Sequence, residues 1–148
     1  MYIEMKREHD RIRSLLDEIG HLIRGDGPPP CGRLARLRWT LVREHMVHSR
    51  RERAVIDTSP CKQSSAGAHR CENDQLEELV LCQVKRWNEA AIGAEWQTYR
   101  AETSNLAHRL RTQMREEERA FSQDEHRLRV AQRSCTTGFR LAGAACAG

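Results

Sequence analysis

Two histidines and a glutamate continue a stripe of leucines in the second quarter of the chain. The stripe advances by three or four residues at each step, through Leu34, Leu37, Leu41, His45, His48, Glu52 and Ile56. This is the spacing of one face of an α-helix. His48 and Glu52 then lie one turn apart, about 6 Å along the axis, on a face that should be buried. Buried polar groups need partners, and this pair is spaced to converge on one metal ion.

Four helical segments would position these residues, namely residues 3–23, 32–57, 73–89 and 94 to beyond 121. In the first, apolar residues recur at alternating steps of four and three, and Gly25 to Pro30 ends it. We predict an all-α, antiparallel up-down four-helix bundle over residues 1–124. Residues 125–148 should form a tail that is helical to about Arg133 and irregular afterwards. Residues 60–71 show no apolar period and are predicted to be a loop.

Polar residues interrupt the inner stripe of three helices. His9 lies between Met5 and Ile12, and Gln113, Glu117 and Glu118 lie between Leu110 and Phe121. In an up-down bundle the start of the first helix is level with the end of the second, and the late turns of the fourth return to that end. Connectivity and spacing therefore predict one polar layer that includes His9, His48 and Glu52.

Composition excludes several other classes of protein. The longest apolar runs are only a few residues, so we expect no membrane span, and the charged N-terminus lacks the apolar core of an export signal. A cytoplasmic location follows as an expectation. Six cysteines without a C-x-x-C pair argue against a zinc ribbon and favour reduced thiols. The net charge of +4 has both signs interspersed, so a solvated surface is favoured over a nucleic-acid interface.

Three segments resemble the hemerythrin-like (HHE cation-binding) family. They are Arg7-Glu8-His9-Asp10-Arg11-Ile12-Arg13, His48-Ser49-Arg50-Arg51-Glu52, and the run from Trp96 through Glu117-Glu118 to Phe121. The resemblance covers roughly residues 3 to 122. It implies a four-helix bundle that holds non-haem iron, with His9, His48, Glu52 and Glu118 as metal ligands. It also implies dioxygen or nitric oxide as small-molecule partners, and a role in oxygen, iron or redox sensing or storage.

The ligand set is smaller than the family pattern. Gln113 stands where the family has a histidine, and residues 73–89 contain none. Two imidazoles and a carboxylate could hold a single ion, and this set of ligands is typical of non-haem iron. His45, Gln113, Glu117 and Asp10 are candidates for additional ligands or for side chains that orient the ligands.

Two readings remain beside the metal site. His9, His48, Glu52 and Glu118 could satisfy one another as a metal-free polar network in a helical interaction module whose site has decayed. Nucleic-acid binding lacks a helix-turn-helix or an aromatic platform. We expect a binding protein rather than an enzyme, because no nucleophile motif is present and no cysteine has a histidine at a spacing that would activate it.

Overall fold

The computed structural model describes the backbone of residues 2–29, 32–58 and 66–141, and the side chains of residues 3–29, 32–54 and 74–123. These residues form helices and turns, and no strand occurs among them. The helices are α1 (Tyr2–Leu22), α2 (Arg33–Thr58), α3 (Ala66–Arg86), α4 (Glu89–Ala94) and α5 (Trp96–Leu141). The chain divides into two compact units, Met1–Thr112 and Gln113–Gly148. We describe each unit by itself.

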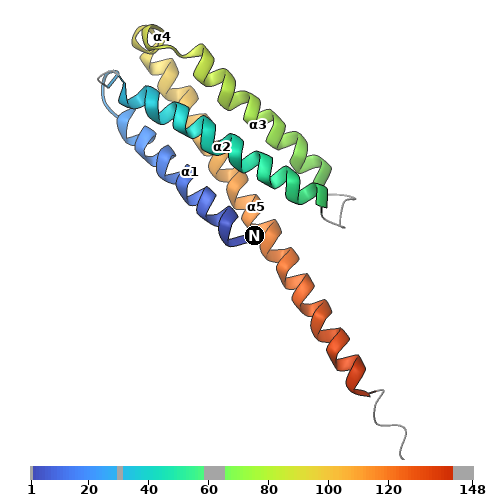
Figure 1. The fold of residues 1–148 in the computed structure, drawn as a ribbon. Helices are drawn as coiled ribbons and strands as arrows, with labels where there is room; N and C mark the ends of the chain where they lie inside the picture. Colours follow the sequence, from blue (N-terminus) through green and yellow to red (C-terminus); the bar gives the residue numbers. More distant parts are fainter. Residues whose placement is uncertain (1, 30–31, 59–65, 142–148) are drawn as a thin grey trace, which may run out of the picture. The chain divides into compact units, whose positions relative to one another are not determined.

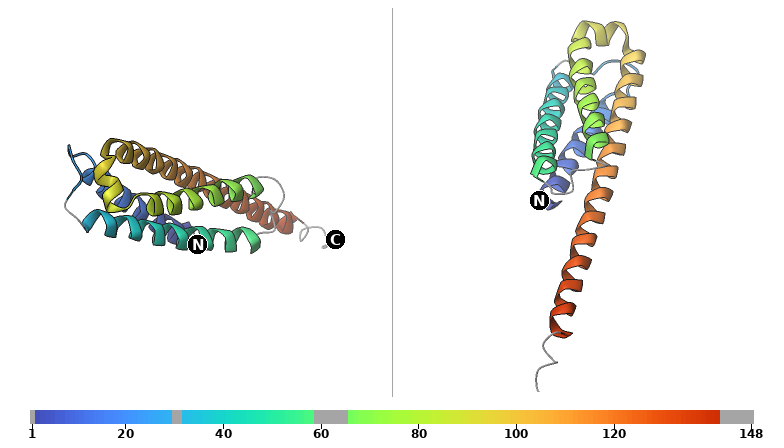
Figure 2. Two further views of the ribbon diagram at one scale, coloured as in Figure 1. Left: turned by 90° about the horizontal axis from the view of Figure 1, so that it is seen from above. Right: turned by 90° about the vertical axis from the view of Figure 1, so that its right-hand side faces the viewer.

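The first unit is built from α1, α2, α3, the short α4 and the first part of α5. In it α1 packs against α2 and α2 against α3, and successive long helices run antiparallel (Figure 1). Both views of Figure 2 keep these helices side by side with the start of α5. This is the predicted all-α antiparallel bundle, and it is confirmed.

The apolar stripes predicted from spacing form the core of this unit. In α1 and just beyond it, Met5, Ile12, Leu16, Ile19 and Ile23 are all buried. Each step of three or four residues returns the side chain to the same face, so α1 buries one stripe and exposes the rest. None of the helices in the described part of the chain is both long and apolar enough to cross a membrane.

A tight reversal joins α3 to α5. Trp87 is 1% exposed, and its indole Nε1 donates to the Glu102 carboxylate at 2.7 Å. Asn88 then caps α4, because its side chain accepts a hydrogen bond from the backbone amide of Ala91 at 2.9 Å. The cap and the buried indole fix where α3 ends and α5 begins.

Two helix boundaries differ from those predicted. α3 begins at Ala66, within the predicted loop of residues 60–71, while residues 60–65 of that loop lie outside the described residues. An apolar period reports burial rather than helicity, and alanine is the best helix former, so a helical turn can lack a period.

The last helix also exceeds its predicted length. In the second unit, α5 continues to Leu141 rather than ending near Arg133. The added stretch contains no proline, and its single glycine, Gly138, costs a helix only about 1 kcal/mol. Residues 142–148, the rest of the predicted irregular tail, lie outside the described residues.

Candidate metal centre

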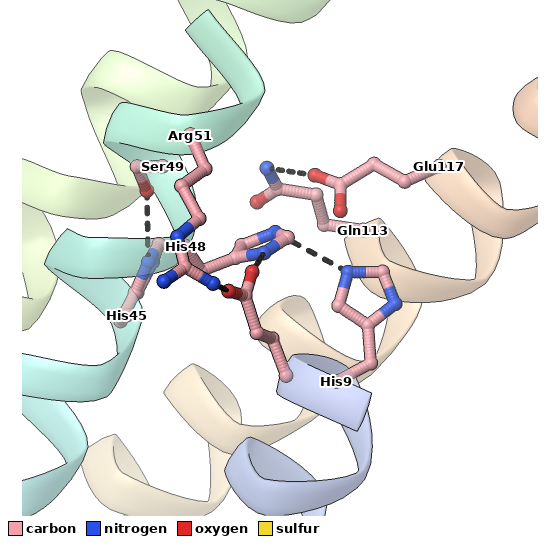
Figure 3. Close-up of polar contacts among 8 residues, drawn as sticks. His9, His45, His48, Ser49, Arg51, Gln113 and Glu117 are labelled. Atoms are coloured by element: carbon pink, nitrogen blue, oxygen red, sulfur yellow. Dashed lines mark hydrogen bonds and ion pairs between the residues drawn. The ribbon is translucent and has the colours of Figure 1, made fainter. Parts of the chain in front are cut away.

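Two imidazoles face each other inside the first unit. His9 of α1 is fully buried and His48 of α2 is 4% exposed. Their Nε2 atoms lie 3.2 Å apart, with the ring planes inclined at 67° (Figure 3). Both residues come from the polar interruptions in the apolar stripes, so spacing alone predicted their burial. Their meeting across two helices confirms that part of the predicted polar layer.

The distance between these two nitrogens suits ligation of one ion. Nitrogens about 2.1 Å from a metal are about 3.0 to 3.4 Å apart when the angle at the metal runs from octahedral to tetrahedral. The observed 3.2 Å falls inside that range. A single ion could therefore replace the contact between the two rings without a large movement of α1 or α2.

A buried glutamate, Glu8, contacts His48 at its second ring nitrogen. The sequence analysis did not predict a role for this residue. Glu8 Oε2 lies 3.2 Å from His48 Nδ1, whereas His9 contacts the other ring nitrogen, Nε2. The other oxygen of Glu8, Oε1, pairs with Arg51 of α2. A carboxylate at Nδ1 favours the tautomer that carries its proton there, which leaves the Nε2 lone pair available for a metal.

The signal for Glu8 was present in the sequence. Glu8 is three residues after Met5 and four before Ile12, so it shares their stripe as well as His9 does. The resemblance drew attention to His9 alone. Arg51 lies one turn beyond Val47 in α2 and carries the charge opposite to that of Glu8. This charge would have indicated the pairing of Arg51 with Glu8.

His45 has a different environment from His48. It is also buried, at 3% exposed, but its Nδ1 lies 3.1 Å from the hydroxyl of Ser49, one turn along the same helix. The close-up shows His45 turned toward Ser49. The predicted use of His45 as an added ligand stays a prediction.

The predicted carboxylates separate into buried and exposed groups. Glu52 is 7% exposed and Glu117 is 4% exposed, whereas Glu118 is half-buried and Asp10 is exposed and paired with Arg13 at 3.2 Å. Within the second unit, Gln113 Nε2 donates to Glu117 Oε1 at 2.7 Å. The assignment of Glu52 and Glu118 as ligands stays a prediction.

Within the first unit, His9 and His48 are buried and could each offer one imidazole nitrogen to a metal ion. Within the second unit, Glu117 is a buried residue that could offer a carboxylate oxygen. We call these three residues the histidine and glutamate group, and Cys82, the thiol among the described side chains, does not belong to it. Two imidazole nitrogens and a carboxylate oxygen suit a first-row transition metal rather than a calcium or magnesium ion, which prefer oxygen alone.

Comparisons with known proteins point to one family. The sequence model of the Hemerythrin HHE cation binding domain matches residues 1–123. No curated protein and no solved structure gives a significant match. The match spans α1 to α4, the part of α5 up to residue 123, and every residue of the histidine and glutamate group. The chain therefore belongs to the hemerythrin HHE cation-binding domain family.

Proposed function

We propose that this protein binds one iron ion through His9, His48 and Glu117. The observation that carries the proposal is the 3.2 Å separation of two buried imidazole Nε2 atoms, which matches two ligands on one ion. Membership of a cation-binding family and the buried carboxylate support it. Two histidines and one carboxylate form a set typical of non-haem iron(II).

The protein's own residues prepare this set. Glu8 keeps the proton of His48 on Nδ1, and Arg51 holds Glu8 in place, so His48 presents its Nε2 lone pair toward His9. Gln113 donates to one oxygen of Glu117 and thereby orients the carboxylate. Iron held there would supply open coordination positions and a redox change between its ferrous and ferric forms.

We infer a sensing or storage role rather than catalysis. His9 and His48 are almost wholly buried, which favours diatomic ligands such as dioxygen or nitric oxide over an organic substrate. Three protein ligands are fewer than two irons require, so the reduced set favours a mononuclear centre over a bridged pair.

Metal analysis tests the proposal directly. We expect protein expressed in iron-supplemented medium to retain close to one iron per chain after gel filtration, and His9→Ala and His48→Ala to retain almost none. His108→Ala is the matched control, because His108 is an exposed histidine of α5 outside the group. Less than about 0.1 transition metal per chain in the wild type, or equal content in His48→Ala, would overturn the proposal.

The second candidate function is a metal-free helical interaction module. It is supported by the contacts among His9, His48, Glu8 and Arg51, which already form a connected network without an ion. Melting the wild type with and without a chelator separates the two candidates. A lower melting temperature in chelator, absent in His48→Ala, favours the metal, since a bound ion stabilises the folded state. Equal melting temperatures favour the module.

A further inference from the structure

A groove runs between the second half of α1 and the start of α5, entirely within the first unit. Its volume is about 470 Å³, within the range of small-molecule pockets. The floor is apolar and buried, and is formed by Leu16, Ile19, Ile23 and Ala107. The groove contains no residue of the histidine and glutamate group, so an inference about it is independent of the proposed iron site.

Small residues keep this groove open. Gly20 of α1 and Ser104 of α5 lie in its lining, where larger side chains would close the seam between the helices. A Cβ placed on Gly20 meets no atom within 4 Å, so the space beside this glycine is empty. Gly20 has an ordinary helical backbone, and its lack of a side chain therefore matters for space rather than for backbone conformation.

The two helices are tied together on either side of the open stretch. Trp96 Nε1 donates to the carbonyl oxygen of Gly25 at 3.3 Å, just beyond the end of α1. Further along α5, Arg111 pairs with Asp17 at 2.6 Å. These ties maintain the spacing of α1 and α5 while Gly20 and Ser104 leave the middle unfilled.

The charge on the groove is strongly asymmetric. Arg24 and Arg100 line it, and within the described part of the chain neither has a carboxylate partner. Among the described side chains, Arg100 donates to the Gln97 amide oxygen, at 3.3 Å. Asp17, the acidic residue of the lining, is neutralised by Arg111. Two guanidinium groups are therefore available at one end of an apolar surface.

We propose that this groove binds a long-chain carboxylate. Arg24 and Arg100 hold the carboxylate, because a guanidinium pairs with a carboxylate through two parallel hydrogen bonds. The hydrocarbon chain lies over Leu16, Ile19 and Ala107, in the space that Gly20 leaves open. A small inorganic anion would leave the apolar floor in water, and a neutral hydrocarbon would not use the two arginines.

Titration calorimetry of the full chain with myristate tests the proposal. We expect saturable binding with one ligand per chain, and weak or no binding of myristyl alcohol and acetate, which carry only the chain or only the head. The double variant Arg24→Gln with Arg100→Gln should bind myristate at least about tenfold more weakly. Its control is Arg11→Gln with Arg109→Gln, which removes exposed arginines of the same helices from outside the groove.

Filling the groove provides an independent test. Gly20→Leu should abolish myristate binding without lowering the melting temperature, since the added side chain enters empty space and leucine favours helix over glycine. Ala101→Leu, an exposed position of α5 outside the lining, is the matched control and should bind normally.

Four results would overturn the proposal. They are no binding of myristate, equal binding of myristyl alcohol, equal loss in the control variants, and unchanged binding in Gly20→Leu. Vesicles of phosphatidylglycerol form a further arm. Binding to these vesicles without binding of free myristate would assign the groove to a lipid headgroup and overturn the free carboxylate. None of these results depends on iron content.

Discussion

Arg38 and His48 are both buried polar residues of α2, but their side chains meet different kinds of partner. Arg38 Nη2 donates to the backbone carbonyls of Gln83 and Val84, each at 3.2 Å, in the last turn of α3. His48 instead meets the ring of His9 and the carboxylate of Glu8. One side chain completes a helix end, while the other converges with groups that are themselves metal donors.

The surroundings of Arg38 fit a structural role. Its guanidinium lies over the Tyr99 ring at 5.6 Å, and the Gln83 amide donates to the Thr103 hydroxyl at 2.8 Å. Burial lowers the pKa of Arg38, and the Tyr99 phenol opposes that shift. The Arg38 cluster, meaning Arg38, Gln83, Tyr99 and Thr103, joins α2, α3 and α5, and both Arg38 Nη2 and Gln83 Nε2 donate to protein oxygens.

The contrast distinguishes buried polar groups that stabilise the fold from buried polar groups that form a binding site. A cation directed at helix carbonyls satisfies orphan acceptors and interacts favourably with the helix dipole. Two imidazole nitrogens that face each other have room for only one proton between them. A metal ion, in contrast, can accept the lone pairs of both nitrogens at once. Substitutions in the Arg38 cluster should therefore change stability, and substitutions beside His48 should change metal binding.

The largest expected effect is on stability, from Arg38→Met. The change removes the Arg38 donor from both carbonyls in a partly buried setting, so that Gln83 keeps only the backbone amide of Trp87 and Val84 loses its side-chain donor. We therefore expect a loss of about 2–4 kcal/mol in the free energy of unfolding. Urea denaturation measures it, with exposed Arg36→Met on the same helix as the control. Iron content per folded chain should stay unchanged, and a fall would place Arg38 in the metal centre.

The next effect is on metal affinity, from Glu8→Gln. The amide lacks the charge that fixes the His48 proton on Nδ1, so iron(II) affinity should fall about 10–100-fold, or about 1.4–2.7 kcal/mol. Competition with a chromogenic chelator measures the dissociation constant. Asp10→Asn is the matched control, because Asp10 is exposed and paired with Arg13. Equal losses in both variants would show a general charge effect and contradict the role of Glu8.

A smaller effect is expected from Thr103→Val. The variant keeps the shape of the side chain and removes the 2.8 Å hydrogen bond from Gln83, which should cost about 1 kcal/mol of stability. Thermal or urea unfolding measures the change, and Thr98→Val at an exposed position of the same helix should be close to neutral. A loss of iron from Thr103→Val would show that the Arg38 cluster also contributes to metal binding, and would contradict its purely structural role.

The smallest effect is a pH dependence carried by Tyr99. Burial raises the pKa of Tyr99 above 10.0, and the charge of Arg38 and the nearby polar side chains of Thr103 and Gln83 only partly offset it. As the pH rises through 10.0, the unfolded chain releases the tyrosine proton that the folded protein retains, so stability falls.

Tyr99→Phe cannot make this contribution. The free energy of unfolding of the wild type should therefore fall relative to that of Tyr99→Phe as the pH rises from about 9 to about 11, and both should run parallel below that range. Urea denaturation across these pH values measures the difference. Parallel curves throughout would mean that Tyr99 ionises equally in the folded and unfolded states.

Much of the candidate site could be predicted one helix at a time. His9, His45, His48 and Glu52 were placed on inner stripes by spacing alone, and all four are buried. The choice among Glu116, Glu117 and Glu118 was harder, because successive helical residues are rotated by about 100° and any of the three can face inward. The structure buries Glu117, leaves Glu118 half-buried and exposes Glu116.

The sequence by itself determined which segments are helical and which face of each helix is apolar, because these properties repeat within a few residues. The tertiary structure decided which polar atoms meet. His9 and His48 are 39 residues apart, and the rotation and axial offset of α1 against α2 place their Nε2 atoms 3.2 Å from each other. The same packing pairs Glu8 with His48, and the packing of α1 beside α5 leaves a groove at Gly20. No local period encodes these relations, since each depends on the space between two helices.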